Sequence, residues 1–194
     1  MEYGILIVGW CVFFFLHSWL AADRCKTWAR LKMGSHFSYY RLLYSVVAFV
    51  TLASILAWQF SMPVLLLPVH PFVKYFLAAP FVVTGGALMA VCIRKYFFRL
   101  SGAQVLYQQE ESPVLETGGV HRWVRHPLYI GTLLLIWGLL AFFPTVANLI
   151  SCALITIYVR VGIPIEEDKL MHVFGDQYRA YKSRTPMLIP GGRR

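Results

Sequence analysis

The segment LYIGTLLLIWGLLAFFPTVANLISCALITIYV, residues 128–159, carries no charged side chain over its 32 residues. A helix that crosses the hydrocarbon core of a bilayer needs about 20 apolar residues, so this segment is too long for one ordinary span. Pro144 and Asn148 interrupt it near the middle, and proline removes a backbone donor and favours a turn. The segment therefore predicts a hairpin of two spanning helices, residues 128–143 and 146–160, that reverses around residues 143–147.

Three further apolar runs lie upstream of this hairpin and are each long enough to cross a membrane. A signal peptide is the competing interpretation of the first run, but only Glu2 precedes it as a charged residue, so the basic region of a signal peptide is missing. We expect a single membrane domain over residues 1–194, with polar segments at 94–127 and 160–194. The predicted upstream spans are residues 4–22, 42–60 and 72–93.

The composition agrees with a membrane protein of the all-α polytopic class. Hydrophobic residues make up 58% of the chain and charged residues 14%, whereas soluble domains carry about 25% charged residues. The mean hydropathy is +0.60. The net charge of +9 does not indicate nucleic-acid binding, because the basic residues flank apolar runs, where they mark topology or contact with anionic lipid. Three of the four cysteines lie inside apolar runs, which indicates packing rather than a disulfide framework.

The basic residues also predict an orientation. Of the 18 Lys and Arg residues, five lie between the first two spans, five in residues 94–125 and seven from residue 160 onward. Five spans place all three groups on one side, which the positive-inside tendency assigns to the cytoplasm. We therefore expect an outside N-terminus and a cytoplasmic C-terminus, and so short a chain suits a bacterial inner membrane.

The first polar segment ends in Arg125-His126-Pro127 at the start of an apolar run. Proline suits the first turn of a helix, and a helix N-terminus favours an anionic group through its free amides and dipole. An interfacial anchor is the alternative, in which Arg122 and Arg125 meet lipid phosphates while neighbouring aromatic residues form a belt.

The second polar segment places the pair Glu166-Glu167 shortly after a span. On a helix, Glu167 shares a face with Leu170, Met171 and Phe174, so one carboxylate can point inward while the other meets solvent. The alternative is a solvated amphipathic helix in which Glu166 pairs with Lys169. Together, the two polar segments predict a pocket at the membrane boundary that could bind a zwitterion.

Other chemistry is less well supported by the sequence. The residues with metal-ligand chemistry do not reproduce a known metal-binding spacing, and we predict no metal. They are His121, His126, Glu166, Glu167 and His172. His17 lies within the first span, where an ionisable residue is a functional candidate by default. Gly85-Gly86 indicates close helix packing rather than a nucleotide loop.

Two motifs resemble those of integral-membrane methyltransferases. Arg125-His126-Pro127-Leu128-Tyr129-Ile130-Gly131 is similar to their RHPxYxG signature. The run from Glu166-Glu167 through Phe174-Gly175, Tyr178 and Tyr181 to Pro190 resembles their C-terminal block. This superfamily includes isoprenylcysteine carboxyl methyltransferases, phospholipid N-methyltransferases and bacterial thiol S-methyltransferases. The resemblance covers about the last 90 residues.

The resemblance implies an enzyme that takes a methyl group from S-adenosylmethionine and transfers it to a lipophilic or amphipathic acceptor. It assigns catalytic and substrate-orienting charges to Arg160, Glu166 and Glu167. The residues that it implies at the cofactor are Gln104, Val105, Leu106, His121, Arg125, His126, Pro127 and Tyr129. His121 departs from the pattern, since many members carry an aromatic residue there.

Two alternatives remain at this point. Membrane sterol or enone reductases that use NADPH resemble the same C-terminal block, but they have Asn after the proline and Trp where this chain has Tyr178. A non-catalytic membrane assembly protein is the second alternative, and the retained Arg, His, Tyr and Glu residues argue against it. The acceptor stays open among a prenylated cysteine carboxylate, a small thiol and a phospholipid amine.

Overall fold

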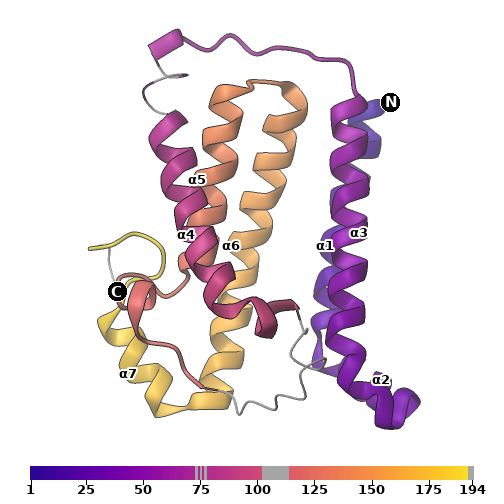
Figure 1. Cartoon of the computed structure of the whole chain (residues 1–194), viewed down its shortest axis with the longest axis vertical. Coiled ribbons are helices and arrows are strands. Elements are labelled where there is room, and N and C mark those ends of the chain that lie inside the picture. The colour runs from indigo at the N-terminus through magenta and orange to yellow at the C-terminus, as the bar shows by residue number, and fades with distance from the viewer. Residues whose placement is uncertain (73, 75, 77, 102–113, 192–194) are drawn as a thin grey trace. The chain divides into compact units, whose positions relative to one another are not determined.

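The described part of the chain is α-helical in a computed structural model that covers residues 1–72, 74, 76, 78–101 and 114–191. Its residues fall into two compact units, one of Met1–Leu65 with Lys95–Glu111 and one of Leu66–Arg94 with Ser112–Arg194. The helices in chain order are α1 (Glu2–Ala21), α2 (Asp23–Met33), η1 (Gly34–Tyr39), α3 (Tyr40–Ser61), α4 (Ala78–Ser101), η4 (Gly119–Arg122), α5 (Pro127–Phe142), α6 (Val146–Phe174) and α7 (Asp176–Arg184) (Figure 1).

The protein is an all-α polytopic membrane protein, as its composition predicts. Four stretches of helix are long and apolar enough to cross a membrane, namely α1, the stretch Asp23–Ser61 that contains α3, the part Ala78–Lys95 of α4, and α6. The remaining apolar helix, α5, has 16 residues, or about 24 Å, so it is shorter than an ordinary span. The predicted spans correspond to α1, α3, α4, α5 and α6, although α4 is described only from Ala78 and the predicted start of its span includes residues outside the described part.

In the first unit, α1 packs lengthwise along α3, with α2 and η1 at one end of the pair (Figure 1). Trp10, Phe13 and Phe14 form an aromatic cluster, and the imidazole of His17 stacks on Phe13 with ring centroids 5.8 Å apart. At the end of the pair next to α2 and η1, the Tyr40 hydroxyl donates to the carbonyl of Leu20 at 2.7 Å. The ring of His17 also lies 6.0 Å from that of Tyr44 on α3, so His17 belongs to an aromatic contact between two helices.

In the second unit, α5 and α6 form the helical hairpin that the apolar segment predicts, with its turn at residues 143–145 (Figure 1). Thr145 is the N-cap of α6, where its hydroxyl accepts from the Asn148 amide at 3.1 Å. The Asn148 side chain donates to the Phe143 carbonyl at 2.7 Å, and the Leu67 amide donates to the Pro144 carbonyl at 2.6 Å. Pro144 thus ends one helix while Thr145 starts the next.

Glycines bring α4 and α5 into close contact in the same unit. A Cβ atom added to Gly85 would lie 2.5 Å from the Leu135 amide nitrogen and 2.7 Å from the Gly131 carbonyl oxygen. A Cβ on Gly131 would lie 3.1 Å from Leu88 and from Met89. The predicted close packing is confirmed for Gly85 but not for Gly86, which has no atom within 4 Å of its added Cβ. The last residue of the RHPxYxG motif is therefore a packing residue.

We expect Gly85→Ala to destabilise the protein by about 1–3 kcal/mol, because the new methyl group has to displace the α5 backbone. Gly86→Ala is the matched control, and its higher helix propensity should leave stability unchanged or raise it by up to about 1 kcal/mol. Thermal unfolding of both variants in one detergent checks the difference. Equal unfolding temperatures would mean that α4 and α5 do not meet at Gly85.

Candidate functional site

The residues Arg125, His126 and Pro127 lie where η4 leads into α5. Pro127 is the first residue of α5 and is buried, as its fixed backbone angle favours. The backbone of this stretch pairs with the end of the chain, because the Arg125 amide donates to the Pro186 carbonyl at 2.9 Å and the His126 amide donates to the Met187 carbonyl at 3.2 Å. Residues 181–187 form the C-terminal segment, and these hydrogen bonds fix the start of α5 against it.

The carboxylates Glu166 and Glu167 lie in the last turns of α6, which continues without a break past Arg160 to Phe174. Gly175 then adopts a φ of +51°, a value that glycine accepts without the cost of a Cβ atom. This turn directs α7 back toward the N-terminal end of α5 (Figure 1). One glycine thus allows the carboxylates and the C-terminal segment to meet.

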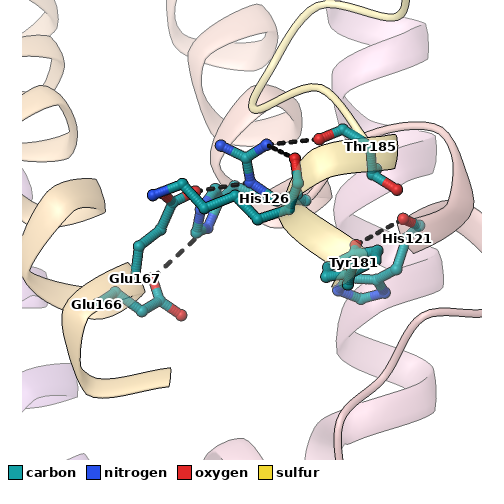
Figure 2. A network of polar contacts seen from close by, with 8 residues as sticks. His121, His126, Glu166, Glu167, Tyr181 and Thr185 are labelled. Atoms are coloured by element: carbon teal, nitrogen blue, oxygen red, sulfur yellow. Dashed lines mark hydrogen bonds and ion pairs between the residues drawn. The ribbon is translucent and has the colours of Figure 1, made fainter. Parts of the chain in front are cut away.

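A buried ionic cluster forms around Glu167, whose side chain is 8% exposed. Its Oε1 atom accepts from Arg125 Nε at 2.7 Å and lies 3.2 Å from His126 Nε2, and its Oε2 atom lies 2.8 Å from Lys182 Nζ (Figure 2). An ionised carboxylate only accepts hydrogen bonds, so His126 Nε2 carries its proton toward Glu167. Glu167 therefore joins both sequence motifs to α7.

Arg125 also binds the C-terminal segment through a second nitrogen atom of its guanidinium group. Its Nη1 atom donates to the carbonyl oxygens of Lys182 at 3.2 Å and Thr185 at 2.5 Å. The Arg125 side chain is only 5% exposed. Arg125 therefore joins Glu167 to the C-terminal segment.

Glu166 has a different environment from its neighbour. Its side chain is 44% exposed, and its Oε2 atom lies 3.7 Å from His126 Nδ1, which is too long for a hydrogen bond. The rings of His126 and Tyr129 stack with centroids 5.5 Å apart, and the Tyr129 hydroxyl is within electrostatic range of Glu166. As predicted, one carboxylate of the pair points inward, because Glu167 is buried. Glu166 meets solvent only in part, since its Oε2 atom is itself buried. Glu166 remains accessible beside an aromatic pair.

Two tyrosines of α7 complete the buried side of the cluster. Tyr178 is 1% exposed, and burial followed by the negative charge of Glu167 raises the pKa of its hydroxyl. Tyr181 donates to the His121 carbonyl at 2.6 Å (Figure 2). α7 therefore contacts the segment before α5 through the Tyr181 hydroxyl as well as through charges.

We expect Tyr181→Phe to destabilise the protein by about 1–3 kcal/mol, because the buried His121 contact loses its donor. Ser183→Ala is the control, since this exposed hydroxyl only donates to Ala180 within α7 and its loss should change stability by less than about 0.5 kcal/mol. Denaturant unfolding of the two variants gives the comparison. Similar free energies of unfolding for both variants would mean that the Tyr181 hydrogen bond does not stabilise the packing of α7.

Several residues singled out in the sequence lie apart from the cluster. Arg160 is exposed, and among the described residues it forms no ion pair. His121 contributes its backbone carbonyl. Gln104, Val105 and Leu106 lie outside the described residues. His172 is 79% exposed and faces Asp168 at 3.5 Å, and within the described part of the chain no three His, Cys, Asp or Glu residues gather as metal ligands.

Sequence reasoning missed Lys182 and Thr185, although both contact the cluster. Lys182 pairs with a carboxylate on another helix, and Thr185 takes part through its backbone oxygen. No spacing rule within one helix connects these positions. Only the turn at Gly175 could have suggested that α7 folds back on the Glu pair.

A cavity of about 300 Å³ lies beside the C-terminal segment. It shares Tyr181 and Thr185 with the surroundings of the cluster but contains none of the residues predicted to bind cofactor or substrate. Its lining is Thr117, Arg122, Gln177, Tyr181, Arg184 and Thr185. This cavity therefore does not coincide with the predicted site residues.

Comparison with known proteins identifies the family. Residues 73–177, more than half of the chain, match the model of the phospholipid methyltransferase family. A methanethiol S-methyltransferase of Mycobacterium tuberculosis is 30% identical over 96% of this chain and 77% of its own length. Methanethiol S-methyltransferase 1 of Bradyrhizobium diazoefficiens is 43% identical, and the mouse protein-S-isoprenylcysteine O-methyltransferase is 29% identical.

Most of these similarities are partial. The Bradyrhizobium alignment covers 42% of this chain and 28% of the relative, and the mouse alignment covers 54% of this chain and 40% of the relative. No solved structure matches the chain. Because the family model covers more than half of the chain, including the RHPxYxG motif and the Glu166-Glu167 pair, and the Mycobacterium relative aligns along nearly the whole chain, this protein belongs to the phospholipid methyltransferase family.

Proposed function

We propose that this protein is a membrane methyltransferase that uses S-adenosylmethionine and methylates a sulfur or carboxylate acceptor of the small-thiol or isoprenylcysteine type. The observation that carries the proposal is the meeting of the RHPxYxG motif and the Glu pair in one cluster, which leaves Glu166 accessible next to His126 and Tyr129. The acceptor class follows the names of the relatives, which are methanethiol and isoprenylcysteine methyltransferases.

The groups at the start of α5 suit the charges of S-adenosylmethionine. His126 is the N-cap residue of α5 but makes no side-chain capping bond, so the first amides of the helix can donate hydrogen bonds to a carboxylate. Glu166 is the accessible negative charge, because Glu167 is surrounded by Arg125, His126 and Lys182. We propose that Glu166 faces the positive sulfonium or amine, and that Arg125 and Glu167 hold the site together.

Methyl transfer depends more on the alignment of the cofactor and the acceptor than on a strong acid or base. Bound S-adenosylmethionine supplies an activated methyl group on a positively charged sulfur. The docked C-terminal segment fixes the start of α5, and the stacked rings of His126 and Tyr129 provide a flat surface against which a planar or cationic group can be oriented. For a thiol acceptor, Glu166 or water can take the proton that the acceptor loses. A carboxylate acceptor needs no base.

We also propose that this site faces the cytoplasm of a bacterial inner membrane. The basic residues support this orientation, since three basic-rich segments share one side when five helices cross. An acceptor with an apolar tail could then enter from the bilayer while the cofactor enters from the aqueous side.

The proposal is tested by titrating the detergent-purified full chain with S-adenosylmethionine, S-adenosylhomocysteine and NADPH. We expect saturable binding of the two adenosyl compounds, weakened at least tenfold by His126→Ala, an effect of about 1.4 kcal/mol. Tyr129→Phe, which keeps the ring, should weaken it less. Labelled methyl transfer to an alkanethiol, an S-prenylated cysteine and phosphatidylethanolamine then identifies the acceptor. Binding of NADPH alone would overturn the proposal in favour of a reductase.

A further inference from the structure

We infer that α2 is a membrane-surface helix that binds the head groups of anionic lipids. α2 joins α1 to α3, and the chain has span-length apolar helices on both sides of it. An 11-residue helix between two spans has to lie at one face of the bilayer. This inference concerns the first unit and does not depend on the proposed methyltransferase activity.

The side chains of α2 divide into two faces. Cys25 and Ala29, four residues apart, are buried against the neighbouring helices of the unit. Trp28 and Leu31, three residues apart, are instead 59% and 81% exposed. Because both are exposed, these two apolar side chains are not explained by packing within the described residues. A Trp and a Leu on one turn suit the boundary between head groups and acyl chains.

Cations lie at both ends of this apolar pair. Arg24 and Lys32 are exposed and stand four residues before and after Trp28, so the order along this side of the helix is cation, Trp28, Leu31, cation. Asp23 faces Lys26 at 3.2 Å, and the Arg30 guanidinium lies 4.8 Å from the centre of the Phe37 ring. Within the described residues, neither Arg24 nor Lys32 has an ion-pair partner.

The charge of this region selects the kind of lipid. Between α1 and the second turn of α3 the chain carries five Lys or Arg residues, which are Arg24, Lys26, Arg30, Lys32 and Arg41. The acidic residue of this stretch, Asp23, already faces Lys26. A zwitterionic head group has no net charge with which to complement this excess, whereas a phosphatidylglycerol head group does. Long basic side chains can reach the phosphates while their stems cover apolar surface.

The test uses the full chain in bilayers that contain lipids brominated on the acyl chains, which quench nearby tryptophan fluorescence. The chain has six tryptophans, so the signal of Trp28 is the difference between the unchanged protein and Trp28→Phe. We expect brominated phosphatidylglycerol to quench the Trp28 signal more than brominated phosphatidylcholine at equal mole fraction. Added salt should reduce this preference.

The double variant Arg24→Gln/Lys32→Gln should bring the ratio of the two quenching values to about 1, because the local surface attraction is lost. The matched control is Lys169→Gln/Arg179→Gln, which removes two exposed charges from α6 and α7 and should leave the ratio unchanged. Equal quenching by both lipids in the unchanged protein would overturn the inference, as would absence of quenching by either. The substituted side chains are all exposed, so the circular dichroism spectrum of each variant should match that of the unchanged protein.

Discussion

Glu167→Gln is expected to destabilise the second unit by about 3–5 kcal/mol and to release the C-terminal segment, because it leaves the buried Arg125 guanidinium without a negative partner. Arg125 is 5% exposed and cannot turn to solvent in place of the lost carboxylate. Lys182, whose side chain is 45% exposed, can do so and adds less to the effect. The variant should therefore unfold at lower temperature than the unchanged protein in the same detergent.

Hydrogen exchange gives a more local measurement of this effect. The amides of Arg125 and His126 donate to the carbonyls of Pro186 and Met187, so they are protected only while the C-terminal segment is docked. We expect faster exchange of these two amides in Glu167→Gln. Asp168→Asn is the matched control, since it removes a neighbouring exposed carboxylate that only faces His172. Equal protection in both variants would mean that Glu167 does not hold the segment.

A double variant measures how much of the stabilisation comes from the interaction between Arg125 and Glu167. Arg125→Met and Glu167→Gln should each be costly, because the first leaves Glu167 with only Lys182 and His126, and the second leaves the buried Arg125 without a negative partner. The double variant should cost less than the sum of the two, since no unpaired guanidinium remains. Additive costs would indicate that the two residues stabilise the unit independently.

Local features of the sequence were sufficient for much of the fold. Pro144 predicts the hairpin, and the structure ends α5 at Phe142 and starts α6 at Val146. The i, i+3, i+4 pattern after Glu167 predicts that one carboxylate of the pair can point inward, and the exposed fractions show that this carboxylate is Glu167. These features depend on residues close in sequence, for which helix geometry alone sets the neighbours.

The rest depended on contacts between distant residues. The sequence gives no sign that α6 continues through Pro164 to Phe174, because a proline within a helix can either end or bend it. The partners of Arg125 at Lys182 and Thr185 lie about 60 positions away and include two backbone oxygens, which carry no side-chain pattern. Close packing at Gly85 but not at Gly86 likewise follows from the direction in which α5 lies.

Substitution of Glu166 is expected to lower activity rather than stability, whereas substitution of Glu167 is expected to lower stability. Glu166→Gln should change stability by less than about 0.5 kcal/mol, because its side chain is 44% exposed and its Oε2 atom lies 3.7 Å from His126 Nδ1, beyond hydrogen-bond distance. If Glu166 faces the cationic centre of the cofactor or takes the acceptor's proton, turnover should fall by about 10²–10⁴-fold in the same variant. Labelled methyl transfer and thermal unfolding of one preparation measure both quantities.

Three adjacent acidic residues of α6 should respond differently to the loss of their charge. Glu166→Gln and Glu167→Gln remove the same charge from neighbouring positions of α6, yet the first should lower turnover in a folded protein and the second should lower stability first. Asp168→Asn removes the same charge one position further on and should do neither, because that carboxylate is exposed. A Glu166→Gln protein with full turnover would assign Glu166 to the solvated face of the helix and would leave the cluster around Glu167 with a purely structural role.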